Sequence, residues 1–113
     1  MKGKPLLPSL RTKKRYVAYE AISEKDVEMT KVYACIRHSF RECFGIFGLG
    51  KAGIMDTRAF NGKRGLLKIN HKYTDHLRTA MSMITEIDGS KIIVNTVGVS
   101  GILKKAKARY LML

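Results

Sequence analysis

Two runs of residues that favour β-strands, AGIMDTRAF and RGLLKIN, lie near the middle of the chain, separated only by Asn61, Gly62 and Lys63. Asn-Gly accepts the positive φ angles of a type I′ turn, and between two such runs it is a strong signal for a β-hairpin. The sequence therefore predicts an antiparallel hairpin around which the other elements must be arranged.

An amphipathic helix is predicted before the hairpin, because apolar residues recur there at spacings of three and four. This stripe consists of Met29, Tyr33, Ile36, Phe40, Cys43, Phe44 and Phe47. Ser23, followed three residues later by Asp26, resembles a capping box and predicts the start of the helix. Gly45, Gly48 and Gly50 are expected to end it.

A second amphipathic helix is predicted after the hairpin, and Gly89 is expected to end it. Its apolar face consists of Tyr73, Leu77, Ala80, Met81, Ile84 and Ile87. The hairpin therefore lies between two helices that each have one face to bury.

Strand-like segments flank this arrangement. The segment RYVAYEAIS, residues 15–23, alternates in polarity, and Val17, Tyr19 and Ala21 form its more apolar side. The segment KIIVNTVGV, residues 91–99, is rich in β-branched residues and suits a strand with neighbours on both sides. Ser100 is positioned to cap one last helix.

The elements follow in the order β-α-β-β-α-β, with an extra basic helix at the C-terminus. Two right-handed crossovers around a hairpin give a four-stranded antiparallel sheet backed by two helices. We therefore predict an α+β, ferredoxin-like fold, which is also the scaffold of the RNA-recognition motif (RRM-like). Residues 1–14 are predicted to form a basic N-terminal extension, and residues 15–113 a single ferredoxin-like domain.

The charge of the chain points to its partner. Lysine and arginine number 22 against 9 acidic residues, which gives a formal net charge of +13. Such an excess in a small chain implies a polyanion, either nucleic acid or an anionic membrane surface. No apolar stretch approaches the roughly eighteen residues that span a bilayer, so nucleic acid is favoured and no membrane association is expected. The start MKGKPLLPSL lacks the apolar core of a signal peptide, which predicts a cytoplasmic protein.

Two clusters carry much of this charge. The first consists of Arg11, Lys13, Lys14 and Arg15, and the second of Lys104, Lys105, Lys107 and Arg109 on a helix whose apolar side is Leu103, Ala106 and Tyr110. One charge run is usually a solvated face, but two runs on so basic a chain favour contact with a polyanion.

The third predicted strand does not carry the aromatic signature with which RNA-recognition motifs stack bases. Arg64 and Gly65 match its start, but Leu66, Lys68 and His71 stand where aromatic rings are required. If the chain binds RNA, we therefore expect recognition by charge and shape.

The segment Gly98-Val99-Ser100-Gly101 precedes the second basic cluster. It lacks the spacing of a phosphate-binding P-loop, and no strand follows the helix to complete a dinucleotide-binding unit. A tight turn with a serine cap is the plainer interpretation, while free N–H groups at a helix N-terminus can also meet one phosphate of a long polymer.

Few side chains suit catalysis or metal binding. The residues considered were His38, His71, His76, Asp56, Glu86 and Asp88. They have neither the spacing of a metal site nor that of a paired acid and base, so no catalytic and no metal-ligating residue is predicted. Cys35 and Cys43 lie in the first predicted helix and are interpreted as two reduced core thiols.

Several segments together resemble archaeal ribonuclease P protein component 2, a relative of the eukaryotic POP-family subunit of ribonucleases P and MRP. They are LPSLRTKKRYVAYEAIS, HLRTAMSMITEIDGSKIIVNTVGVSG and the basic tail. The likeness covers most of the chain and is weakest between Lys25 and Phe60. Leu7, Thr12 and Ile102 depart from residues common in that family.

The resemblance implies a non-catalytic, RNA-binding subunit of a ribonucleoprotein, an endonuclease that removes the 5′ leader of precursor tRNA. It implies that the RNA subunit performs a Mg²⁺-dependent hydrolysis, that this chain holds no cofactor, and that its protein partner is component 3. The RNA contacts implied by the family are Arg11, Lys13, Lys14, Arg15, Ser100, Gly101, Lys104 and Lys105.

Two other functions make different demands on the sequence. A small-molecule-sensing regulatory domain on the same fold would use the glycine turn as a ligand loop, but it predicts low charge and a second domain. A freestanding nuclease would need acid and base residues that the sequence does not offer.

Overall fold

A computed structural model describes residues 13–113. The strands are β1 (Lys14–Ser23), β2 (Met55–Asn61), β3 (Arg64–Asn70), β4 (Glu86–Ile87) and β5 (Ser90–Ser100). The helices are α1 (Met29–Ala52), the short 3₁₀ turn η2 (His71–Tyr73), α2 (Thr74–Ser82), α3 (Leu103–Ala106) and its π-helical continuation η3 (Lys107–Leu111).

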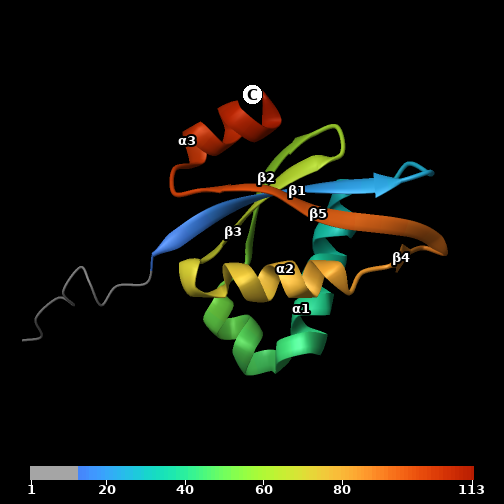
Figure 1. Cartoon of the computed structure of the whole chain (residues 1–113), viewed down its shortest axis with the longest axis horizontal. Coiled ribbons are helices and arrows are strands. Elements are labelled where there is room, and N and C mark those ends of the chain that lie inside the picture. The colour runs from blue at the N-terminus through green and yellow to red at the C-terminus, as the bar shows by residue number, and fades with distance from the viewer. Residues whose placement is uncertain (1–12) are drawn as a thin grey trace, which may run out of the picture.

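The strands form one sheet in the order β2-β3-β1-β5-β4, and every neighbouring pair is antiparallel. Helices α1 and α2 cover one face of this sheet, and α3 lies over the other (Figure 1). The predicted α+β, ferredoxin-like fold is confirmed, with the short β4 as a fifth strand that the sequence did not indicate.

The central hairpin is confirmed, but its turn is one residue later than expected. Asn61 still pairs with Arg64, so Gly62 and Lys63 are the two turn residues. Only Gly62 has a positive φ angle, 60°, as at the first central position of a type II′ turn.

The start of α1 differs from the prediction. Ser23 pairs with Ile92 in the sheet and donates its hydroxyl to the carbonyl of Lys25, so it cannot cap a helix. The helix begins at Met29, and its N-cap residue Glu28 makes no side-chain hydrogen bond there. The sheet register, which is set by contacts with β5, therefore overrides the local capping signal.

Of the three glycines expected to end this helix, only Gly45 interrupts it, with φ 77° and ψ 175°. The chain then resumes a helical path through Gly48 and Gly50. It ends at Ala52, where Gly53 adopts a left-handed conformation and donates its N–H to the carbonyl of Leu49. Gly45 is thus a kink within α1 rather than its end.

The second helix is shorter than predicted, because α2 ends at Ser82. Ile84 and Ile87 are buried as expected, but they lie beyond the helix, and Ile87 belongs to β4. Asp88 and Gly89, at φ 51° and 78°, form the two-residue turn between β4 and β5. Both angles are positive, so this turn has the type I′ character that had been expected at the other hairpin.

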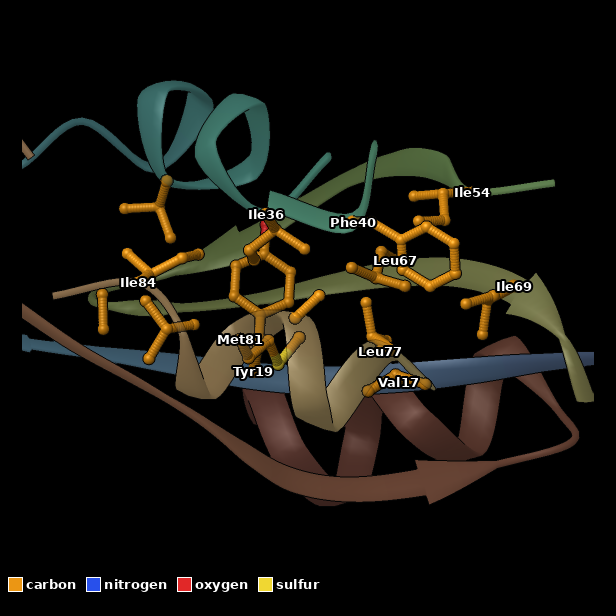
Figure 2. Packing of buried hydrophobic residues seen from close by; sticks show 14 of the residues in the cluster. Val17, Tyr19, Ile36, Phe40, Ile54, Leu67, Ile69, Leu77, Met81 and Ile84 are labelled. Carbon is orange, nitrogen blue, oxygen red and sulfur yellow. The ribbon is translucent and has the colours of Figure 1, made fainter. Parts of the chain in front are cut away.

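The main core lies between the sheet and the pair α1 and α2. The prediction that Val17, Tyr19 and Ala21 point to one apolar side is confirmed, since all three are buried there. Figure 2 shows Val17 and Tyr19 of β1 packed with side chains of the helices and of β3, among them Ile36, Phe40, Leu67, Ile69, Leu77 and Met81.

A second, smaller core lies on the opposite face, beneath α3. Its buried members are Ala18, Ala59, Leu66, Ala106 and Leu111. The register shifts between Ala18, which pairs with Gly98, and Tyr19, which pairs with Thr96, so β5 carries one extra residue there. Such a bulge bends the strand locally. The sheet is consequently covered by helices on both faces near its centre.

The cysteine prediction holds only in part. Both thiols are free, but Cys35 is half-buried and Cys43 is exposed. At 3.6 residues per turn, positions eight apart differ by about 80° around the helix, so the two do not share one buried face. Among residues 13–113, no helix combines the length and apolarity needed to cross a membrane.

Candidate nucleic-acid interface

The fold brings the first predicted basic cluster to the turn that leads into the second. Tyr16, near the start of β1, pairs with Ser100, at the end of β5. The Arg15 guanidinium lies against the following turn, because a Cβ added at Gly101 would be 3.5 Å from Arg15 Nη1. Residues from opposite ends of the chain therefore form one surface. We call it the basic end, and it comprises Lys13 to Arg15 around the start of β1 and the Ser100–Gly101 turn that leads into the terminal helix.

Lys13 and Lys14 lie at this end as well. Lys13 is exposed, and its carbonyl accepts a hydrogen bond of 2.8 Å from the N–H of His71. The Lys14 ammonium lies 3.0 Å from the position a Cβ would take at Gly53, where the last turn of α1 ends. A cation near a helix C-terminus is favoured by the helix dipole. Arg11 lies outside the described residues.

The sequence reasoning missed further basic residues at this end. Lys68 pairs with Tyr16 across the sheet, and His71 and Lys72 follow directly after β3. These residues are scattered along the chain, so no charge run identifies them. Only the antiparallel pairing of β1 and β3, in which Lys14 faces Asn70, places them beside the first cluster.

The second cluster lies on the terminal helix. Lys104, Lys105 and Arg109 are exposed, whereas Lys107 is half-buried. The predicted apolar side is confirmed, because Ala106 is buried and Leu103 and Tyr110 pack against the second core, with Leu111 as a further buried member. The helix therefore presents its charges to solvent while its other side is held on the sheet.

Contacts with the central hairpin fix the end of this helix. Arg64 Nη1 donates to the carbonyl of Tyr110 at 3.1 Å, and the Asn61 side-chain amide donates to the carbonyl of Leu111. The Tyr110 ring lies directly against Gly98, where an added Cβ would overlap it. The orientation of the basic helix is thus set by residues of β2, β3 and β5.

The turn before the helix differs from the prediction. Ser100 does not cap α3, whose N-cap residue is Ile102. The Ser100 hydroxyl instead accepts from the N–H and donates to the carbonyl of Ile102, each at 3.2 Å. Ser100 is the last residue of β5, so it lies too far before the helix to reach the first free N–H groups inside it.

Within residues 13–113, no carboxylate forms an ion pair with the charges at the basic end. The ion pairs found within residues 13–113 are Lys31–Asp88, His38–Glu42, Arg64–Glu20 and Arg78–Asp75. None of them includes a residue of either predicted basic cluster. Positive charge that lacks an internal partner is available to an external polyanion.

The sheet face used for base stacking in RNA-recognition motifs is not open here. Ala18 and Leu66 occupy its centre, and both are buried beneath the terminal helix. A helix covers the place where stacking rings would stand, which agrees with the missing aromatic signature. This arrangement favours contact through phosphates and shape.

The residues considered for chemistry are spread over the molecule. His38 lies beside Glu42 on the exposed side of α1, and the His76 ring contacts Phe44 and Tyr73. In the part of the chain that the structure describes, no group of three His, Cys, Asp or Glu residues is placed to hold a metal ion. The absence of a catalytic residue on this chain stays a prediction.

Two grooves were compared with the glycine turn. One, of about 1530 Å³, follows β5 and the α2–β4 connection. The other, of about 440 Å³, lies along the kinked half of α1. The first reaches Gly98, at the start of the Gly98–Gly101 segment, but neither groove is lined by Val99, Ser100 or Gly101. The geometry therefore gives no support to a ligand loop at this turn.

Comparisons with known proteins show which sequences and which fold the chain is similar to. A sequence model of the Rpp14/Pop5 family matches residues 15–111. Ribonuclease P protein component 2 of Archaeoglobus fulgidus is 35% identical over 115 residues, which covers 98% of each chain. The protein of the same name from Thermococcus gammatolerans is 37% identical, covering 97% of this chain and 92% of its own. A chain in the cryo-EM structure of yeast ribonuclease MRP has the same fold, with a TM-score of 0.62 at 17% identity over 80% of this chain and 76% of its own.

Proposed function

Because the chain belongs to the Rpp14/Pop5 family, we propose that it is a non-catalytic, RNA-binding subunit of ribonuclease P. In this role it supports the RNA subunit in removing the 5′ leader of precursor tRNA. The observation that carries the proposal is the basic end, where Arg15 contacts the Gly101 turn and neither cluster is paired with a carboxylate in the described residues.

In this proposal the RNA and the protein have different roles. Mg²⁺-dependent hydrolysis is assigned to the RNA subunit. This chain contributes cations that neutralise phosphates, which releases counterions and favours the folded RNA. The RNA contacts proposed are Arg11, Lys13, Lys14, Arg15, Ser100, Gly101, Lys104, Lys105, Lys107 and Arg109.

The proposed partners are the ribonuclease P RNA, precursor tRNA as the substrate of the holoenzyme, and protein component 3. Exposed apolar residues support a protein partner, since Ile46 and Phe47 are 62% and 85% exposed. Both lie in the second half of α1, beyond the kink at Gly45, so Phe47 is exposed although it was predicted in the apolar stripe of this helix. The cytoplasmic location stays a prediction.

The test concerns Lys104 and Lys105. If both contact phosphates, each contributes about 0.7 to 0.9 to the log–log slope of RNA affinity against salt. The double replacement Lys104→Ala/Lys105→Ala should flatten that slope by roughly 1.5 and weaken binding to any structured RNA. The slope is measured by titrating the ribonuclease P RNA at four or more salt concentrations.

A matched control is Lys25→Ala/Lys91→Ala, which removes two exposed lysines at the opposite end of the sheet. It has the same net charge as the test variant and should leave most of the slope intact. Equal slopes in the two double variants, at equal melting temperatures, would show that the terminal helix is only a solvated face.

A further inference from the structure

The kink in α1 forms a groove away from the second core. Gly45 turns the chain, and the second half of the helix then lies beside the arginines of the first half. The groove measures about 440 Å³ and is lined by Arg37, Arg41, Ile46, Leu49, Gly50, Gly53 and Ile54. A Cβ added at Gly50 would meet no atom within 4 Å, so the glycine leaves that part of the groove open.

Three exposed apolar residues gather at this groove, Ile46 in its lining and Phe47 and Met55 directly after lining residues in the chain. Ile46 is 62% exposed, and Phe47, which follows it along the helix, is 85% exposed. Met55, next to Ile54 at the start of β2, is 57% exposed. Exposed apolar residues that gather at one place mark interaction surfaces, whereas single ones need no explanation.

The lining of the groove is also cationic. Arg37 and Arg41 are one helical turn apart and exposed, and neither has a carboxylate within 4.0 Å among residues 13–113. A guanidinium binds a carboxylate through two parallel hydrogen bonds, and arginine is enriched at protein interfaces. The groove therefore complements a segment that presents acidic and apolar side chains together.

We infer that this groove is the docking site of a second protein, which inserts a segment carrying carboxylates beside apolar side chains. The inference rests on the proposed function in one respect, because component 3 is taken as that protein. Lys14 reaches Gly53 at the rim of the groove. A protein bound there would therefore sit beside the basic end and could contact the same RNA.

A nucleic acid fits this groove less well. Single-stranded RNA is held by stacking of bases on aromatic rings. The apolar residues that line the groove are aliphatic, namely Ile46, Leu49 and Ile54, and Phe47 beside the groove is a single ring rather than a stacking platform. Aliphatic side chains opposite two arginines favour a protein segment, and contact with RNA becomes an outcome that the experiment can detect.

The experiment measures calorimetric binding of component 3 to the full chain and to single variants. Phe47→Ser and Arg41→Glu should each weaken binding at least tenfold, because aromatic and arginine residues dominate interface affinity. Ile93→Ser is the control for an exposed apolar residue, at 57% exposure, and Lys25→Glu is the control for the charge change. Both controls should stay within twofold of the original chain.

RNA affinity and thermal unfolding are recorded for each variant. Phe47→Ser should leave both unchanged, since Phe47 is almost fully exposed. If the original chain binds component 3 and the two test variants bind equally well, the docking site is wrong while the proposed function stands. If Phe47→Ser lowers RNA affinity but leaves the binding of component 3 intact, the proposed protein docking site is also wrong. Failure of the original chain to bind component 3 would overturn both the proposed partner and this site.

Discussion

Tyr19 is a residue whose burial has a measurable consequence. Its side chain is fully buried in the main core, and its hydroxyl has no hydrogen-bond partner among the described residues. Burial, and to a lesser extent the negative charge of Asp56, raises the pKa of this hydroxyl well above its ordinary value near 10. The folded protein thus holds the Tyr19 proton more tightly than the unfolded chain does.

This difference predicts a loss of stability in alkali. Because the pKa of Tyr19 is raised in the folded state, the protonated hydroxyl contributes fully to the free energy of unfolding below about pH 10. Above that pH this contribution is lost, at up to about 1.4 kcal/mol per pH unit. Tyr19→Phe should remove this part of the pH dependence of stability. At pH 7 the same replacement should be neutral or slightly stabilising, since it deletes an unpaired polar group.

The measurement is urea unfolding of both proteins at pH 7 and at pH 11. Burial also raises the pKa of Tyr33, but that contribution is present in both proteins and cancels in the comparison. An equal fall in the free energy of unfolding for the two proteins would contradict the assignment to Tyr19.

At the scale of elements, the terminal helix depends on one close contact. The Tyr110 ring occupies the place where a side chain at Gly98 would stand. Gly98 is not among the residues with a positive φ angle, so its role is to leave space rather than to relieve backbone strain. The bulge in β5 brings this glycine to the face that the helix covers.

We therefore expect Gly98→Ala to destabilise the protein by about 1 to 3 kcal/mol, the usual cost of overpacking. For a domain of this size, each kcal/mol corresponds to about 4 to 8 °C in melting temperature. Gly50→Ala adds the same single methyl group where no atom lies within 4 Å, and it should be neutral or stabilising.

A second replacement identifies the cause. Shortening Tyr110 to alanine costs stability by itself, but it also removes the ring that the new methyl group would meet. The double variant Gly98→Ala/Tyr110→Ala should accordingly be more stable than the sum of the single effects predicts. Additive effects would show that Gly98 is required for another reason.

At the scale of the whole molecule, the lysines and arginines are clustered, whereas the histidines and carboxylates are dispersed. Cations gather at the basic end, whereas the histidines and carboxylates lie on separate elements without a metal-binding group in residues 13–113. This distribution is the one expected of a molecule that neutralises phosphates, and it motivates the prediction that no side chain of this chain is a general acid or base.

Single alanine replacements of His38, His71, His76, Asp56 and Glu86 should each lower precursor-tRNA cleavage by the reconstituted enzyme less than tenfold. A general acid or base usually contributes at least a hundredfold. The assay is single-turnover cleavage at saturating protein. A loss of several orders of magnitude in a variant that still folds would place chemistry on this chain.

The sequence by itself determined the order of the elements other than β4, the inner face of β1 and the apolar side of the terminal helix. These features depend on short-range periodicity, since side chains alternate along a strand and recur every three or four residues on a helix. It also indicated the central hairpin, although the turn lies one residue later, at Gly62 and Lys63.

Only the tertiary structure decided where the elements end and which charges meet. The sequence predicts Ser23 as a helix cap, but Ser23 pairs with Ile92 in the sheet. It predicts Gly89 as the end of a helix, but Gly89 lies in a turn because Ile87 pairs with Ser90. Arg15 and Gly101 come together because β1 and β5 are antiparallel neighbours. Such contacts join residues far apart in the chain, and local propensity carries no information about which strands will pair.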